Sequence, residues 1–134
     1  MLNAWWKILT ATLLCIVNLS MVIVNLTLAT ICFLNSCHPA LVGRDTPTGI
    51  FQLDHVATKQ PGYGGDVLVF KESRHYAWAI HRVWLLVPAP HRLLTLTKGT
   101  SAQRWITMGC INVMPDVYAK LAACCSASKL KVEF

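Results

Sequence analysis

Residues 104–121 read RWITMGCINVMPDVYAKL, and this stretch holds both a reactive side chain and the start of a helix. Pro115 is tolerated in the first turn of a helix, and Asp116 is favoured at the positive end of the helix dipole. Apolar residues then recur at helical spacing, which predicts a helix from Pro115 to about Cys125. Cys110 lies a few residues before this helix, directly after a glycine.

Cys110 is the cysteine most suited to chemistry. Three of the other five lie in or at the end of a long apolar run: Cys15, Cys32 and Cys37. Cys124 and Cys125 are adjacent, and a bond between neighbours is strained, so we expect two small apolar residues and no disulfide framework. A single cysteine with histidines elsewhere is a candidate nucleophile. Gly109 would let backbone approach a substrate, and the amides of Gly109 and Cys110 would face an oxyanion if the turn is sharp.

A cysteine nucleophile needs a general base, and a histidine is the expected one. The chain has five histidines: His38, His55, His75, His81 and His91. The first lies against the apolar run, the second follows an expected strand, and the third lies in an expected turn. His81 and His91 therefore remain as candidates for the base.

The N-terminal part of the chain is strongly apolar. Residues 8–37 include no Asp, Glu, Lys, Arg or His, a run longer than the roughly 7–15 apolar residues of a signal peptide. The run matches the about 20 residues of a membrane-spanning helix, and residues 5–7, WWK, would anchor its near end. We expect residues 1–41 to form a membrane anchor or an uncleaved signal segment.

Two other interpretations of the apolar run stay open. One is a buried core helix, and the other is a bacterial lipoprotein processing site at Leu34–Cys37. A membrane anchor with a basic residue on its near side favours a cytoplasmic N-terminus and a domain on the outside. Residues 42–134 have the composition of a globular protein, and we expect them to form one small domain.

The elements expected in residues 42–134 are mostly strands. Aromatic, β-branched or alternating residues predict four of them: Ile50–Asp54, Asp66–Phe70, Tyr76–Trp84 and Lys129–Phe134. Glycine and proline predict a loop at Gln60–Gly65, prolines at 88 and 90 open another, and Arg92–Leu96 fits either a short strand or one turn of helix. The predicted fold class is mainly β with one α-helix, preceded by an N-terminal hydrophobic helix.

Charge and motif spacing disfavour several classes of function. The formal net charge is +6, but the basic residues are scattered and form no block, so nucleic-acid binding has little support. No Cys or His pair has the spacing of a zinc site, and no glycine-rich phosphate loop is present. We expect neither a metal nor a cofactor.

Three blocks of the sequence resemble those of the L,D-transpeptidase catalytic domain (YkuD-type), found in bacterial cell-wall enzymes. Thr46–Phe51, TPTGIF, is similar to the family's Thr-Pro-x-Gly-x-Phe turn and strand. Thr107–Val113, TMGCINV, is similar to its active-site segment, and Ile80–Trp84, IHRVW, to the histidine-containing strand of a subgroup. The blocks follow the family's order, and the similarity covers about residues 42–134.

The resemblance implies a β-rich fold and a cysteine nucleophile that acts on peptidoglycan stem peptides. In this family the cysteine attacks the amide after a meso-diaminopimelate residue, D-alanine leaves, and an acceptor amine resolves the thioester. The matching residues are Cys110 as nucleophile and His81 as general base. Thr107, Gly109 and Asn112 would line the site.

The chain also departs from the family pattern. The usual spacing of about fifteen residues before the Ser or Thr favours His91 as the base, whereas the IHRVW block favours His81, which we select. Met108 occupies a position where a second histidine is common. Strands that precede the Thr-Pro-x-Gly turn in the family are expected to be missing here, with the apolar segment in their place, so the domain would be truncated.

The resemblance further implies a location and partners. We expect a protein of the bacterial cell envelope, anchored in the inner membrane with its catalytic domain in the periplasm, where stem peptides are its partners. The acceptor stays open between cross-linking, lipoprotein attachment and trimming by water. The alternative is a catalytically inactive membrane-anchored relative that binds peptidoglycan or a partner.

Overall fold

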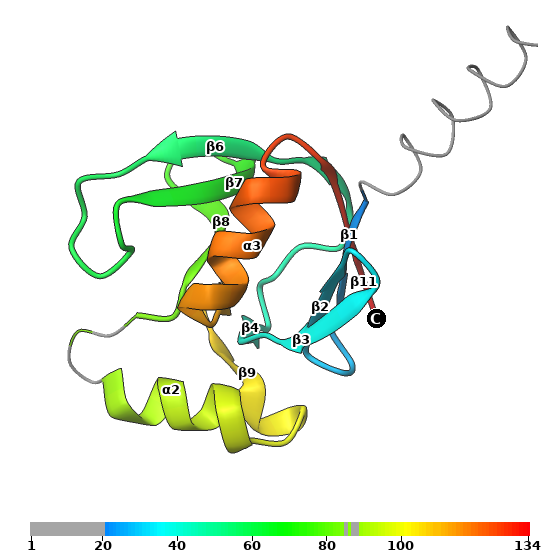
Figure 1. Ribbon diagram of the computed structural model, residues 1–134, viewed down its shortest axis with the longest axis vertical. Coiled ribbons are helices and arrows are strands. Elements are labelled where there is room, and N and C mark those ends of the chain that lie inside the picture. The colour runs from blue at the N-terminus through cyan, green and yellow to red at the C-terminus, as the bar shows by residue number, and fades with distance from the viewer. Residues whose placement is uncertain (1–20, 85, 87–88) are drawn as a thin grey trace, which may run out of the picture.

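The computed structural model describes residues 21–84, 86 and 89–134, and the first part of the expected apolar helix lies outside these residues (Figure 1). The described part contains the strands β1 (Val22–Asn25), β2 (Thr30–Phe33), β3 (Ser36–Pro39), β4 (Val42–Gly43), β5 (Gly49–Gln52), β6 (Asp54–Ala57), β7 (Asp66–Glu72), β8 (Ala77–Arg82), β9 (Trp105–Thr107), β10 (Ile111–Val113) and β11 (Lys129–Glu133). Its helices are α2 (Ala89–Lys98), α3 (Pro115–Cys125) and the short 3-10 helix η1 (Ala102–Arg104). The prediction of a mainly β fold is confirmed, although a second α-helix, α2, joins the one expected.

The larger sheet has five strands in the order β3-β2-β1-β11-β5. β1 runs parallel to β11, with Val22 opposite Leu130. Val22 and Val24 alternate with less buried neighbours, which is the pattern of a strand that buries one face. The expected helix over residues 8–37 is therefore wrong from Val22 onward, and β1 to β4 stand before Thr46 where the sequence predicts no strands.

Tight turns explain why the apolar run does not continue as one helix. Between β1 and β2, Asn25 Oδ1 accepts a hydrogen bond from Leu28 N at 2.8 Å. Leu34 and Asn35 connect β2 to β3 with φ values of 48° and 62°, the left-handed conformation of two-residue hairpin turns. Of the asparagines in the apolar run, Asn25 and Asn35 thus stabilise turns, and Asn18 lies outside the described residues. The apolar residues between Asn25 and Asn35 belong to the larger sheet.

Two disulfides contradict the prediction of no disulfide framework. Cys32 and Cys37 lie opposite each other in the β2–β3 register and are bonded. Cys124 and Cys125 are bonded to each other at the C-terminal end of α3. Cys110 is the free cysteine of the described residues.

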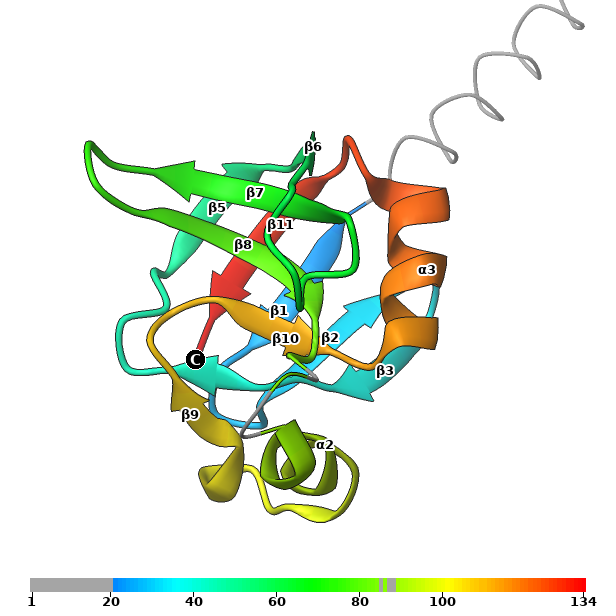
Figure 2. The same cartoon turned by 90° about the vertical axis from the view of Figure 1, so that its left-hand side faces the viewer.

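The smaller sheet has the order β10-β8-β7-β6, and it faces the larger sheet across a shared core (Figure 2). One buried cluster includes Val24 from the larger sheet, Phe70 and Ile80 from the smaller sheet, and Tyr118 from α3. Burial of apolar side chains between two sheets and a helix is the main stabilising contribution of such a fold. α3 begins at Pro115 and has the bounds that the sequence predicts.

The segment that fits either strand or helix in the sequence, Arg92–Leu96, belongs to α2. Pro90 falls in the first turn of this helix, where proline is tolerated. Leu96 is buried with Leu41 and Val83 in a second, smaller cluster, which docks α2 against the rest of the domain. Of the two α-helices described, neither has the length and apolar character needed to span a bilayer.

Candidate active site

The loop that carries Cys110 connects β9 to β10, and the Thr107 side chain holds it. Thr107 Oγ1 accepts a hydrogen bond from Gly109 N at 3.2 Å and donates one to Cys110 O at 2.7 Å. Gly109 has a φ of 136°, which side-chain-bearing residues rarely adopt. The Gly109 amide, considered for an oxyanion site from the sequence, is thus used within the loop, and Gly109 itself is buried.

The turn at Thr46 supports this loop from behind. Thr46 Oγ1 donates to Gly109 O at 2.9 Å and accepts from Gly43 N at 3.0 Å. Trp78 Nε1 donates to Asp45 O at 3.1 Å, and a Cβ atom on Gly109 would lie 2.8 Å from that nitrogen. Two of the sequence blocks, 63 residues apart at these atoms, are therefore in direct contact.

Strands β8 and β10 bring His81 and Asn112 together. The strands are parallel neighbours, and Asn112 lies opposite His81. Cys110 directly precedes β10, and its side chain lines the same cleft as Asn112. A cleft of about 320 Å³ is lined by Tyr63, Tyr76, His81, Trp84, Arg92, Thr107, Met108, Cys110 and Asn112. His91 is exposed on α2 and is not part of this lining.

The His81 ring is buried, with 5% of the residue exposed, and both ring nitrogens have partners. Nδ1 lies 2.7 Å from Arg82 O, a carbonyl that only accepts, so Nδ1 carries the proton. Nε2 lies 3.3 Å from Asn112 Nδ2 and accepts its hydrogen bond. Burial lowers the pKa of His81, the Arg82 carbonyl opposes this, and the nearby Arg92 charge lowers it further. The imidazole is therefore neutral near pH 7.

The Cys110 sulfur is partly exposed and has only long polar contacts. Sγ lies 3.8 Å from Ala77 O and 3.9 Å from Tyr76 Oη. Burial, followed by the neighbouring Cys110, raises the pKa of Tyr76 to about 12, so this phenol stays protonated and can donate. Within the described residues, no hydrogen bond joins Cys110 to His81, although both side chains line the same cleft.

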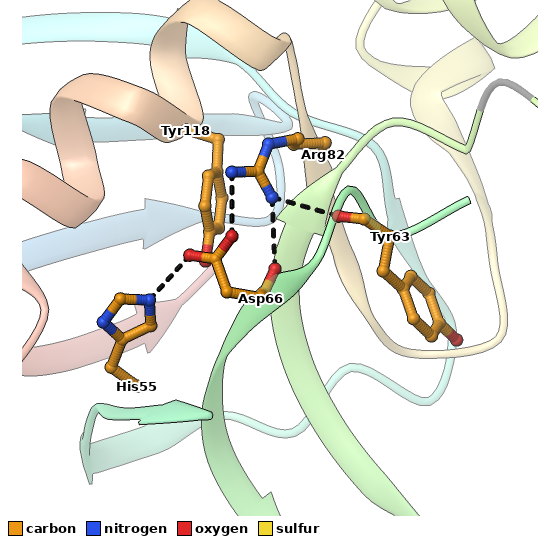
Figure 3. A network of polar contacts seen from close by, with 5 residues as sticks. All are labelled: His55, Tyr63, Asp66, Arg82 and Tyr118. Atoms are coloured by element: carbon orange, nitrogen blue, oxygen red, sulfur yellow. Dashed lines mark hydrogen bonds and ion pairs between the residues drawn. The ribbon is translucent and has the colours of Figure 1, made fainter. Parts of the chain in front are cut away.

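Tyr63 covers His81 from the loop between β6 and β7. Its ring centroid lies 4.6 Å from that of His81 and 5.0 Å from that of Trp84, both edge to face. Arg82 Nη1 donates to Tyr63 O at 3.0 Å and to Asp66 O at 3.2 Å, so the residue after His81 holds the covering loop (Figure 3). The cleft wall is thereby fixed to strand β8.

Asp66 is the centre of the polar network behind this loop, and Figure 3 shows the side chains of His55, Arg82 and Tyr118 directed toward its carboxylate. Oδ1 pairs with Arg82 Nη2 at 2.9 Å. Oδ2 accepts from His55 Nε2 at 2.6 Å and from Tyr118 Oη at 2.9 Å. Burial raises the pKa of Asp66, but the hydrogen bonds from these three partners outweigh it and lower the pKa. Asp66 is therefore ionised at neutral pH.

Five cleft residues are not predicted from the sequence as site residues: Tyr63, Tyr76, Trp84, Arg92 and Met108. Arg92 projects from α2, and its Nη1 donates to Asn112 Oδ1 at 3.2 Å. Tyr63 lies in a glycine-rich loop, and Gly62 carries a φ of 97° beside the Trp84 ring. The density of glycine around a lone tyrosine is the local signal that points to Tyr63, whereas no local signal marks Arg92.

The arrangement combines a free sulfur, a neutral imidazole and a cationic side chain in one concave site. A thiol and an imidazole are the groups that acyl transfer through a thioester requires. Among the described residues, no group of three or more His, Cys, Asp or Glu is placed to hold a metal ion.

Comparison with known proteins finds similarity at the level of the fold. No protein-family model and no curated protein sequence matches the chain. An L,D-transpeptidase from Mycobacterium smegmatis matches with a TM-score of 0.53 and 16% identity over 85% of this chain. An L,D-transpeptidase from Stackebrandtia nassauensis matches with a TM-score of 0.50 and 15% identity over 84% of it. The chain spans 58% and 54% of the length of these two proteins. The described residues therefore have an L,D-transpeptidase-like fold.

Proposed function

We propose that this protein is a cysteine acyltransferase of the L,D-transpeptidase type that acts on peptidoglycan stem peptides. The observation that carries the proposal is that Cys110 and His81 line one cleft of an L,D-transpeptidase-like fold. In this assignment Cys110 is the nucleophile and His81 the general base. Thr107 and Gly109 position the Cys110 loop, and Asn112 orients the His81 ring.

The reaction has two stages. In the first, His81 accepts the thiol proton of Cys110 while the sulfur attacks the carbonyl carbon of meso-diaminopimelate. The C–N bond then breaks, and D-alanine leaves as an amine that takes the proton from His81. In the second stage an acceptor amine attacks the thioester and gives a proton to His81; the C–S bond breaks, and His81 returns the proton to the Cys110 sulfur. Water in place of the amine would trim the peptide.

The hydrogen bond between Asn112 and His81 bears on the first stage. Nε2 holds the free lone pair of the ring, and this lone pair accepts from Asn112. Because catalytic hydrogen bonds are often loose in an empty site and tighten with substrate, we expect the donor peptide to compete for the Asn112 amide. Nε2 would then be free for the Cys110 proton.

Release of D-alanine from a stem tetrapeptide that contains meso-diaminopimelate tests the proposal. The purified protein should release D-alanine, and Cys110→Ala should release none above the uncatalysed rate. The double variant Cys124→Ala, Cys125→Ala is the control, because it removes the vicinal disulfide outside the lining of the cleft without leaving a new free thiol, and it should retain release per folded molecule. Equal release by the wild type and Cys110→Ala would refute the proposal.

A specific observation favours the second candidate, an inactive relative that binds wall peptides. Both His81 nitrogens already have partners, and neither partner is Cys110. A domain of this kind would bind the tetrapeptide with equal affinity in the wild type and in Cys110→Ala, and it would release no D-alanine. The two measurements together therefore separate the candidates.

We also infer that the domain acts in a bacterial cell envelope, on the periplasmic side. The disulfide between Cys32 and Cys37 supports this location, because disulfides persist in oxidising compartments. In this proposal the apolar residues before β1, of which 1–20 lie outside the described residues, serve as the expected membrane anchor or uncleaved signal segment. Alkylation of protein taken from cells without reductant should leave Cys32 and Cys37 unlabelled; labelling of both would contradict the inference.

A further inference from the structure

Arg92 is the cleft residue to which the proposed reaction gives no role. Its described hydrogen bond is the one from Nη1 to Asn112 Oδ1, at 3.2 Å. A guanidinium carries five N–H donors in a planar fork. Most of the donors of Arg92 therefore have no partner among the described residues, and they can bind a group that enters the cleft.

The charge of the cleft indicates what kind of group this is. No Asp or Glu is present among the described residues that line the cleft, and Arg92 is the one residue of that lining with a permanent charge. His81 is neutral because burial lowers its pKa. A guanidinium without an acidic partner in a concave site attracts an anion, and its fork matches the two oxygens of a carboxylate.

The position of Arg92 relative to Cys110 limits which carboxylate can reach it. Asn112 holds Arg92, and Cys110 precedes Asn112 by two residues, so their Cα atoms lie at most roughly 7 Å apart. In a peptide donor, the next carboxyl carbon lies roughly 3.3–3.6 Å from the attacked carbonyl carbon. A hydrogen bond of about 2.8 Å between guanidinium and carboxylate bridges the remaining distance. The leaving residue is thus the part of the donor whose carboxylate fits.

We propose that Arg92 binds the free carboxylate of the leaving residue. The cleft would then select acyl donors in which the scissile amide precedes a C-terminal residue, and it would reject chains that continue or end in an amide. This inference rests on the proposed acyltransferase function. Its rival is a structural role, in which Arg92 only holds Asn112 and, through it, the His81 ring.

Two peptides that differ at one group separate these roles. The probes are the stem tetrapeptide with a free C-terminal carboxylate on D-alanine and the same peptide with a C-terminal carboxamide. Binding is measured by calorimetry on Cys110→Ala, which cannot form the thioester. Because a hydrogen bond to a charged group contributes about 1.5–3 kcal/mol, we expect the acid to bind about 10- to 100-fold more tightly than the amide.

The double variant Cys110→Ala, Arg92→Gln should bind both peptides with similar affinity, because it lacks the guanidinium that would bind the carboxylate. Arg92→Lys keeps the positive charge but lacks the planar guanidinium, so it should retain part of the preference for the acid over the amide. It is also the variant to measure if Arg92→Gln fails to fold. Lys120→Gln removes one positive charge from the exposed face of α3 and should leave the preference unchanged. In chains that keep Cys110, the ratio of kcat/KM for acid over amide should fall with Arg92→Gln.

Several results would overturn the inference. Equal binding of the two peptides by Cys110→Ala would do so, as would no binding of either peptide. A loss in Arg92→Gln that is equal for acid and amide would assign Arg92 the structural role. The proposed function fails separately: a preference for the acid that depends on Arg92, without any D-alanine release, would refute catalysis and leave the carboxylate site in place.

Discussion

Two arginines near the cleft, Arg82 and Arg92, differ in how many partners they have. Arg82 pairs with the Asp66 carboxylate, donates to two backbone carbonyls, and lies 4.1 Å from the centroid of the Tyr118 ring. Arg92 donates to one amide oxygen, that of Asn112. A guanidinium whose donors are paired fixes a structure, whereas one with free donors is available to a ligand.

The same contrast separates the two regions in which these arginines lie. In the Asp66 network each carboxylate oxygen has a charged or hydroxyl partner within 3 Å. In the cleft, the described polar contacts of the Cys110 sulfur are longer, at 3.8 Å and 3.9 Å. The network holds the Tyr63 loop over His81. In the cleft, by contrast, the Cys110 sulfur and most Arg92 donors have no close polar partner among the described residues. The fold thus places a rigid, satisfied region directly behind a reactive one.

Replacement of the two candidate bases should give the largest difference. His81→Ala should lower the rate of D-alanine release by about 10²- to 10⁴-fold, the usual contribution of a general base. His91→Ala should change it less than about twofold, because His91 is exposed on α2 outside the cleft lining. A large loss with His91→Ala and little with His81→Ala would reverse the assignment.

Gly109→Ala tests whether the Cys110 loop must keep its shape. The φ of 136° is unfavourable for alanine, and the new Cβ would lie 2.8 Å from Trp78 Nε1. Strain of this kind costs about 1–3 kcal/mol, so we expect a lower free energy of unfolding and about tenfold slower release. Gly65→Ala has a φ of 106° but open space around the new Cβ; it should lose stability without slowing release per folded molecule.

Sequence patterns identify the parts of this fold that depend on local signals. Pro115 and Asp116 mark the start of α3, and the strands expected at Asp66–Phe70 and Lys129–Phe134 are present as β7 and β11. The apolar run is misleading because a membrane helix and a buried hairpin share the same uncharged composition. The β-branched run Val22–Val24 and the asparagines at the turns, Asn25 and Asn35, are the signals that distinguish them.

Only part of the site can be predicted from the sequence, because only some of its residues lie in local motifs. Cys110 and His81 lie in recognisable blocks, and the parallel register of β10 and β8 brings those blocks together. Tyr63 and Arg92 reach the cleft through long-range packing of a loop and of α2, which no short motif encodes. The vicinal disulfide at Cys124 is likewise invisible to spacing rules that expect separated pairs.

Asp66→Asn tests the satisfied region by its effect on stability. Loss of the charge weakens three charge-assisted hydrogen bonds, so the free energy of unfolding at pH 7 should fall by about 1–3 kcal/mol in urea titrations. The folded-state pKa of Asp66 is lowered, so its contribution is present above the unfolded value of about 4 and disappears as pH falls through the folded value.

The difference between Asp66→Asn and the wild type should therefore vanish in acid. Asp54→Asn is the matched control, because Asp54 is exposed on β6 and has no ion pair among those described. A cost that is the same at pH 7 and in acid would show that the Asp66 charge contributes nothing.

The pH profile of the reaction should show the smallest effect. Burial lowers the pKa of His81, so its neutral form persists into acid, and the acidic midpoint of kcat/KM should lie below the ordinary value of 6.5. Arg92→Gln removes a nearby positive charge and should move that midpoint upward. A midpoint above 6.5 in the wild type, or a downward shift in Arg92→Gln, would contradict this assignment.

The most direct test of the central claim is the intact mass of the protein after exposure to a thiol-reactive carbapenem. If Cys110 is a nucleophile activated by His81, the wild type should gain the mass of one carbapenem, and peptide mapping should locate it on Cys110. His81→Ala should gain it far more slowly, and Cys110→Ala should gain none. An unmodified wild type, or an equal adduct on Cys110→Ala, would contradict the account.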